Sequence, residues 1–247
     1  MTNSDSLNKI KVVYSPVFHL VIDNLLGQRI NEEIFNHIIS LKDHFVTAQI
    51  SGNAIDQNLR SNTLVYLDKL FGEAGHIAKK TDAWPRVKAI RAKRSPLLRE
   101  LDNLVENPIL SELMESAPFP LCKFNQMDTW ETQLSRYGDV GQFFLWHCDR
   151  TKSDKRAVSV IYYVFKPPPK FTGGELSLTN GLHFRGRLIG NPEIAQVSPT
   201  NDRLVIFGSR TVHSVQPTSS PIQFEDGRFS VNIWIGRERL QDLNDVW

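Results

Sequence analysis

The sequence has 247 residues, a length that single, mainly β domains commonly reach, so we expect one core. Hydrophobic residues make up 40% and charged residues 23% of the chain, and the formal net charge is only +2, which is ordinary for a globular protein and identifies no class of partner. Met1 to Lys11 lacks the pattern of a signal peptide, and the apolar stretch Pro16 to Leu26 is too short to span a bilayer. The two cysteines, Cys122 and Cys148, argue against a disulfide scaffold, so we expect a cytoplasmic protein with no membrane contact.

The first 120 residues mix strand and helix patterns. Short apolar runs predict strands at Lys11 to Tyr14 and at Val17 to Ile22. Apolar residues at helical spacing predict a helix from about Arg29 to Lys42 and a second helical region from about Pro96 to Met114, which an internal proline should divide in two. The polar segment Ile50 to Arg60 has the composition of an exposed loop. We expect these helices to pack against a sheet.

From about Leu121 the chain changes to short β-branched and aromatic runs separated by Gly, Pro, Asn and Asp, which is typical of an all-β barrel or double sheet. The predicted strands are Thr129 to Tyr137, Phe143 to Cys148, Ala157 to Phe165, Glu175 to Leu178, Arg203 to Gly208, Val212 to Gln216 and Phe229 to Ile235. Lys166 to Lys170 contains three prolines and cannot pair inside a sheet, and Thr172 to Gly174 is predicted to form a turn.

His147 and Asp149 are separated by one residue at the end of an apolar, aromatic run. Residues two apart in a strand face the same side, so an imidazole and a carboxylate would point to one place while Cys148 faces away. Two imidazoles and one carboxylate are typical of mononuclear non-haem Fe(II) sites, because they leave positions open for a co-substrate and O2, which a structural zinc site does not. His213, after the apolar strand Leu204 to Phe207, is the candidate second imidazole, although a lone histidine is more often a core residue.

Arg228 stands at the start of the apolar run Phe229 to Ile235, so its guanidinium should be buried. A buried charge is costly unless a partner meets it. The alternatives are an internal Asp or Glu, a side chain that reaches solvent, or the distal carboxylate of a dicarboxylate co-substrate held by the guanidinium fork.

A basic run lies between Lys79 and Arg99 and is compatible with an anionic substrate or a nucleic acid. Such a run is more often a solvated face, and no nucleic-acid-binding module is recognisable, so a nucleic-acid partner is disfavoured.

The segment from about Thr129 to Ile235 resembles the prolyl hydroxylase branch of the Fe(II) and 2-oxoglutarate dependent oxygenases. The resemblance rests on several short motifs that occur in the same order. They are Tyr137, Gly141 and Phe144 before His147 and Asp149; Arg156 at the start of a strand with Ile161-Tyr162-Tyr163; Gly173-Gly174-Glu175-Leu176; His213, Val215 and Pro217; and Arg228-Phe229 with Trp234.

The resemblance implies a mainly β fold with flanking α-helices and a double-stranded β-helix core of the jelly-roll or cupin kind. It implies one oxygenase domain over residues 1–247, with a mixed α/β support region at about 1–120 and the catalytic double-stranded β-helix at about 121–240. By resemblance, three side chains bind Fe(II): His147, Asp149 and His213. Arg228 would pair with the far carboxylate of 2-oxoglutarate. Tyr137 and Tyr163 would hydrogen-bond this co-substrate, Ile161 and Leu176 would wall its pocket, and strand alternation makes Asn232 and Trp234 candidates for the substrate side.

The activity implied is hydroxylation of an unactivated C–H bond in an amino acid, an amino-acid-derived metabolite or a peptidyl residue. O2 and 2-oxoglutarate would be consumed, succinate and CO2 released, and ascorbate would serve as reductant. Three alternatives remain open: desaturation or cyclisation with the same cofactors, demethylation of nucleic acid, and a non-catalytic iron or 2-oxoglutarate sensor. Neither the prime substrate nor the oligomeric state follows from the sequence.

Overall fold

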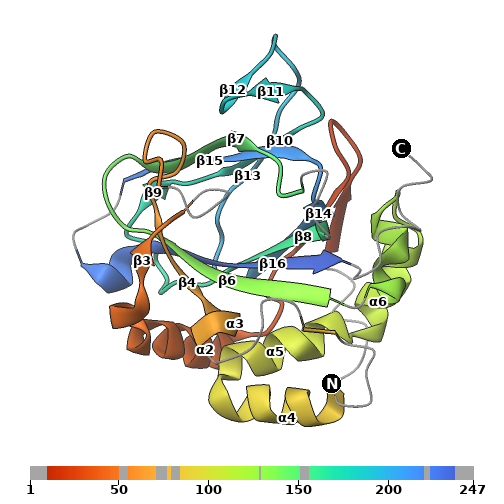
Figure 1. Ribbon diagram of the computed structural model, residues 1–247, viewed down its shortest axis with the longest axis vertical. Helices are drawn as coiled ribbons and strands as arrows, with labels where there is room; N and C mark the ends of the chain where they lie inside the picture. The colour runs from red at the N-terminus through yellow and green to blue at the C-terminus, as the bar shows by residue number, and fades with distance from the viewer. Residues whose placement is uncertain are drawn as a thin grey trace.

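Two antiparallel sheets form the centre of the protein, and helices cover the outer face of the larger one (Figure 1). The computed structural model describes residues 10–49, 55–70, 77–78, 84–127, 129–150, 156–219 and 223–236. A membrane-crossing helix is absent from these residues, since each helix there is too short or too polar for one.

The larger sheet has nine strands within the described ranges, in the order β1-β2-β14-β8-β16-β6-β4-β3, with β5 beside β6. Their bounds are β1 Ile10–Val13, β2 His19–Ile22, β14 Arg203–Gly208, β8 Arg156–Tyr163, β16 Arg228–Gly236, β6 Thr129–Tyr137, β4 Thr63–Tyr66, β3 Val46–Thr47 and β5 Ile77–Ala78. The strand β16 lies between β6 and β8, so it is central in the sheet.

The smaller sheet lies opposite and contains, in the described part of the chain, the order β13-β10-β15-β7 with β9 beside β15. These strands are β13 Ala195–Val197, β10 Leu176–Thr179, β15 Val212–Ser219, β7 Gln142–His147 and β9 Thr172–Gly173. A separate hairpin of β11 (His183–Phe184) and β12 (Arg187–Leu188) projects beyond this sheet (Figure 1).

The helices are α2 Gln28–Ser40, α3 Leu67–Leu70, α4 Trp84–Arg94, α5 Pro96–Val105 and α6 Pro108–Glu115, with short 3-10 turns η1 Lys42–His44, η3 Leu121–Gln126 and η4 Phe224–Asp226. The division between α5 and α6 has a local cause. Asn107 accepts the backbone N–H groups of Ile109 and Leu110 at 2.9 and 3.3 Å, and Pro108 then starts the new helix where no N–H is needed. The predicted break is therefore confirmed.

Alternation along β16 sorts its side chains between two environments. Phe229, Val231 and Ile233 belong to the hydrophobic cluster that the large sheet shares with the helices. Arg228, Ser230, Asn232 and Trp234 have the opposite parity and line a cavity between the sheets. The central strand thus presents an apolar face to the helices and a polar face to the interior.

The predicted class, mainly β with flanking helices, is confirmed, and β6 and β14 have the predicted bounds. Three local predictions are wrong. Thr172 and Gly173 pair with β15 rather than forming only a turn. Arg60, predicted at the end of an exposed loop, is only 7% exposed, while residues 50–54 of that loop lie outside the described residues.

The basic run between Lys79 and Arg99 also differs from the prediction, and its residues 79–83 lie outside the described part of the chain. It contains a buried cation rather than forming only a solvated face. Arg91 on α4 is fully buried, and its Nε donates to Asp102 Oδ2 on α5 at 2.9 Å. Part of the positive charge in this run is therefore neutralised inside the helical layer.

Candidate metal centre and active site

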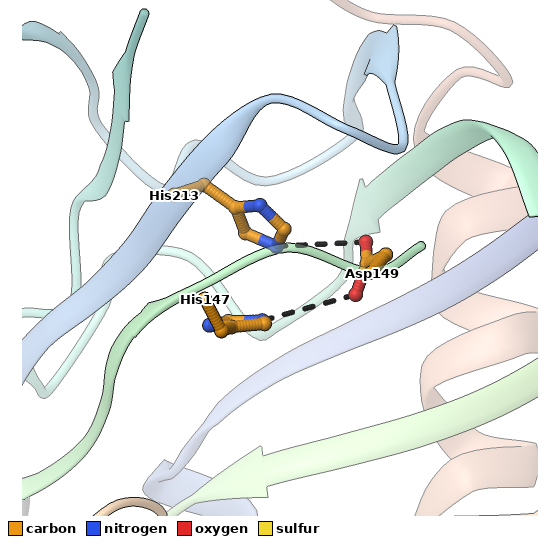
Figure 2. Close-up of side chains that lie close together, drawn as sticks. All are labelled: His147, Asp149 and His213. Carbon is orange, nitrogen blue, oxygen red and sulfur yellow. Dashed lines mark ion pairs between the residues drawn. The ribbon is translucent and has the colours of Figure 1, made fainter. Parts of the chain in front are cut away.

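Three potential metal ligands meet where β7 and β15 lie side by side (Figure 2). His147 is the last residue of β7, Asp149 follows just beyond the strand, and His213 lies directly opposite His147 on β15. The Nε2 atom of His147 is 3.8 Å from Asp149 Oδ1, and that of His213 is 3.5 Å from Asp149 Oδ2. The candidate ligand atoms all lie within 4.8 Å of one another.

Backbone carbonyls fix the orientation of both imidazoles. His147 Nδ1 donates to Leu145 O at 2.7 Å, and His213 Nδ1 donates to Thr211 O at 2.8 Å. In the neutral rings the lone pairs therefore reside on the Nε2 atoms, which face Asp149. Two imidazole lone pairs and one carboxylate directed at one point repel each other unless a cation lies between them, so this donor set fits a divalent metal.

Burial and neighbouring charges set the protonation states that such a site needs. Burial lowers the pKa of His147 well below its ordinary value, and His213 lowers it further, against the opposing effect of Asp149. Burial alone would raise the pKa of Asp149, but the two imidazoles and a 2.6 Å hydrogen bond from Ser159 Oγ outweigh it, and this pKa is lowered. At neutral pH, His147 is thus neutral and Asp149 ionised, the forms that bind a metal.

Arg228 is 1% exposed on β16. Its Nε donates to Gly174 O at 2.8 Å, and Nη1 lies 3.4 Å from Ser230 Oγ. The guanidinium carbon is 4.9 Å from the ring centroids of both Tyr137 and Tyr163. No carboxylate in the described part of the chain pairs with Arg228, and its burial excludes a side chain that reaches solvent. An external carboxylate is the remaining alternative for this guanidinium.

Close backbone approach at Gly174 makes room for this arginine. Gly174 has a φ of +74°, and a Cβ added there would lie 2.6 Å from Arg228 Cδ and 2.9 Å from Thr218 Oγ1. A larger residue would therefore displace Arg228 as well as strain the backbone. The double glycine of the sequence motif has a direct steric reason.

Unused hydrogen-bonding groups collect around Arg228. The hydroxyls of Tyr163 and Thr218 are buried, and neither makes a hydrogen bond of good geometry with the described residues. Burial raises the pKa of Tyr163, so its hydroxyl stays protonated and able to donate, although the nearby Arg228 lowers this pKa in part. Buried polar groups normally have hydrogen-bond partners, so a bound ligand with acceptor oxygens would supply the partners that these two hydroxyls lack.

The predicted pocket residues are brought together with one partial exception. The space between these side chains is about 440 Å³ including its open mouth, of which about 30 Å³ can hold the centre of a water-sized sphere. Its walls include the three candidate metal ligands and Arg228 together with Tyr137, Ile161, Leu176, Asn232 and Trp234. Tyr163 does not line the cavity itself but lies behind it against Arg228.

Three further residues line the cavity that were not predicted as site residues: Arg60, Ser159 and Ser230. Ser159 and Ser230 have the parity of predicted inward residues on their strands, so the alternation that identified Asn232 and Trp234 contained a signal for them. Arg60 had no such signal, because it precedes the short strand β4, which the sequence analysis did not identify.

Comparison with known proteins agrees with this geometry. Residues 132–236 match the 2OG-Fe(II) oxygenase superfamily. This segment therefore has the sequence pattern of that superfamily. The match implies Fe(II) as metal and 2-oxoglutarate as co-substrate, and the matched segment contains the three candidate ligands and Arg228.

Among curated proteins, the chain is similar to an uncharacterized PKHD-type hydroxylase of Synechocystis sp., with 23% identity over 229 residues. The alignment covers 92% of this chain and 65% of that protein, so the chain spans slightly less than two thirds of the relative's length.

Among solved structures, a prolyl hydroxylase from Trichoplax adhaerens, in complex with a hypoxia inducible factor oxygen degradation domain peptide fragment, superposes with a TM-score of 0.59. The identity is 19%, and the superposition covers 91% of this chain and 86% of that one. A Pseudomonas putida prolyl-4-hydroxylase gives a TM-score of 0.53 at 17% identity, covering 89% and 92% of the two chains. These superpositions show the shared fold, and the predicted double-stranded β-helix core is confirmed.

Proposed function

We propose that this protein is an Fe(II) and 2-oxoglutarate dependent dioxygenase that hydroxylates a C–H bond of an amino acid, an amino-acid-derived metabolite or a peptidyl residue. The observation that carries the proposal is Arg228. Its buried guanidinium has no carboxylate partner among the described residues, and it lines the same cavity as His147, Asp149 and His213. A dicarboxylate that reaches the metal with one end would neutralise this charge with the other.

Each side chain of the site has a distinct role in this proposal. The two Nε2 atoms and the Asp149 carboxylate would hold Fe(II), and Ser159 would orient that carboxylate. Arg228 would grip the distal carboxylate of 2-oxoglutarate, with Tyr163 and Thr218 donating to it from behind. When bound, the metal and co-substrate supply the oxidation of an unactivated C–H bond by O2, with release of succinate and CO2.

The remaining walls exclude water from the reacting groups. Ile161, Leu176 and Val215 form an apolar side of the cavity. Phe144 stacks on the His147 ring with centroids 3.5 Å apart and covers one face of it. This shielding would favour oxidation of the substrate over oxidation of solvent or protein, because water is kept from the reactive centre.

The relatives' names support the hydroxylation outcome. The curated relative is named a hydroxylase, and two of the superposed structures are prolyl hydroxylases, one of them with a peptide. Asp149 is an intact carboxylate, which agrees with a hydroxylase rather than a halogenating site. Ascorbate as reductant is part of the same proposal.

The experiment is a screen of free amino acids and short peptides for stimulated succinate release with Fe(II), ascorbate and 2-oxoglutarate. Mass spectrometry of the product separates the outcomes: hydroxylation adds one oxygen atom, whereas desaturation or cyclisation removes two hydrogens. A sensor would bind 2-oxoglutarate without forming succinate. Failure of the metal-loaded protein to bind 2-oxoglutarate would refute the proposal as a whole.

A further inference from the structure

A second buried guanidinium, that of Arg60, lines the cavity. The chain next to it passes from one sheet to the other. Leu59 and Ser61 hydrogen-bond the backbone of β7 in the smaller sheet, and Thr63 then pairs with Arg136 on β6 in the larger sheet. Arg60 thus lies at the side of the cavity where the two sheets are joined.

The neighbours of Arg60 fix the orientation of its guanidinium group but do not neutralise its charge. Its Nε donates to Asn62 Oδ1 at 2.7 Å, and its Nη2 donates to Gln133 Oε1 at 2.8 Å. The guanidinium carbon lies 4.6 Å from the centre of the Phe144 ring, which stacks on His147. These partners are uncharged, and in the described part of the chain Arg60 forms no ion pair. Its Nη1 donates to none of the described residues, so it can donate to a ligand.

The charges around the cavity leave one positive charge uncompensated. When both imidazoles bind the metal through their lone pairs, the charged side chains of the cavity are Asp149, Arg228 and Arg60. Bound Fe(II) and doubly ionised 2-oxoglutarate would add +2 and −2, so they would not change the total of +1. A single carboxylate would bring this total to zero, whereas a phosphate dianion would exceed it. Because burial makes an unpaired charge costly, a monoanion is the favoured occupant.

We propose that Arg60 binds a carboxylate of the prime substrate, an inference that rests on the proposed function. The substrate class is then an N-acylated amino acid, or another molecule with one carboxylate and no cationic group near the oxidised carbon. Arg60 binds the carboxylate of the substrate, and Arg228 binds the distal carboxylate of the co-substrate. Asn232 and Trp234 line the same cavity and offer an amide and an aromatic wall to the rest of the substrate.

The test measures binding without turnover. The protein is loaded with Mn(II) and 2-oxoglutarate in the absence of O2 and titrated by calorimetry. The probes are the N-acetyl derivatives of the proteinogenic L-amino acids, each compared with its primary amide. Because a hydrogen bond to a charged group is among the stronger ones, we expect at least one acid to bind about tenfold or more tightly than its amide.

Variants of Arg60 assign the preference to this residue. Arg60→Gln removes the charge, and we expect the acid to bind about tenfold more weakly and no better than its amide. Arg60→Lys keeps the charge and loses the planar fork, so it should retain part of the preference. Arg187→Gln is the matched control, because it makes the same charge change on the exposed strand β12, outside the cavity. It should leave the acid preference unchanged.

The outcomes separate this inference from the proposed function. If 2-oxoglutarate does not bind to the Mn(II)-loaded protein, the proposed function itself fails. If it binds but no acid binds better than its amide, or if Arg60→Gln keeps the preference, only the role of Arg60 is overturned. The role of Arg60 is also overturned if both Arg60 variants bind acids, amides and Mn(II) more weakly by the same factor. Arg60 would then act only by supporting Phe144 and His147.

Discussion

Replacing Arg228 with methionine should remove most of the affinity for 2-oxoglutarate without destabilising the ligand-free protein. Methionine fills the space of the arginine side chain as far as Nε, but it carries no charge and does not reach the position of the guanidinium carbon beside Tyr137 and Tyr163. The structure provides no second cation beside Arg228 among the described residues that hydrogen-bond or contact it. The distal carboxylate of the co-substrate would therefore be buried without a counterion.

The size of the effect follows from this burial. Removing one partner of a buried, hydrogen-bonded charge pair costs about 2–5 kcal/mol. Arg228 is 1% exposed, and its Nη2 and weakly engaged Nη1 can form two hydrogen bonds, so we take about 3–4 kcal/mol. This corresponds to an affinity that is lower by about 10²- to 10³-fold.

The stability of the ligand-free protein, in contrast to its affinity for 2-oxoglutarate, should not fall. The substitution removes the hydrogen bond to Gly174 O, worth about 1.5–3 kcal/mol for a charged donor, but it also removes a buried charge that lacks an ionic partner. We expect the free energy of unfolding of the variant to be equal to that of the parent or slightly higher. Most substitutions of buried residues lower this free energy, so the sign of the change is informative.

Calorimetry with Mn(II)-loaded protein measures the affinity, and urea unfolding with and without 2-oxoglutarate measures stability. Arg203→Met is the control, because Arg203 is ion-paired with Asp23 and does not line the cavity. Its affinity for 2-oxoglutarate should equal that of the parent. The prediction is refuted if Arg228→Met binds 2-oxoglutarate within about threefold of the parent, or if the free energy of unfolding of the ligand-free variant is clearly lower than that of the parent.

Three further outcomes follow from the structure. His213→Ala should abolish Mn(II) binding and succinate formation, and a variant that retains either one would contradict the ligand assignment. Ser159→Ala should lower metal affinity or activity by about 10- to 100-fold, because Asp149 loses its 2.6 Å hydrogen bond, and an unchanged affinity and activity would show that this bond does not orient the ligand. Asp102→Ala should lower the free energy of unfolding by about 3–5 kcal/mol, since Arg91 would stay buried without its carboxylate, and a loss below about 1 kcal/mol in urea unfolding would count against it.

Local patterns in the sequence were sufficient to predict the strands that carry the site. Arg228, Asn232 and Trp234 were placed on one face by alternation alone, and the structure has them in one cavity. The helix break at Pro108 was equally local, because the residue before it caps the next helix. Features of this kind need only the residues within one element.

The features that were missed depend on partners far along the chain. Arg60 is buried because its segment pairs with β7, more than eighty residues later in the sequence. Arg91 tolerates burial because Asp102 comes from the next helix, and no charge count over the basic run reveals that pairing. The two-residue strand β9 exists only because β15 lies beside it. Such placements follow from tertiary contacts, which composition and periodicity do not encode.

The candidate ligands and Arg228 come from different layers of the protein. His147 and His213 belong to β7 and β15 of the smaller sheet, whereas Arg228 belongs to the centre of the larger one. A metal with a dicarboxylate attached would thus tie one layer to the other across the interior. Loading the site should slow amide hydrogen exchange in both layers together, so that the cofactors act as a cross-link of the fold as well as reagents.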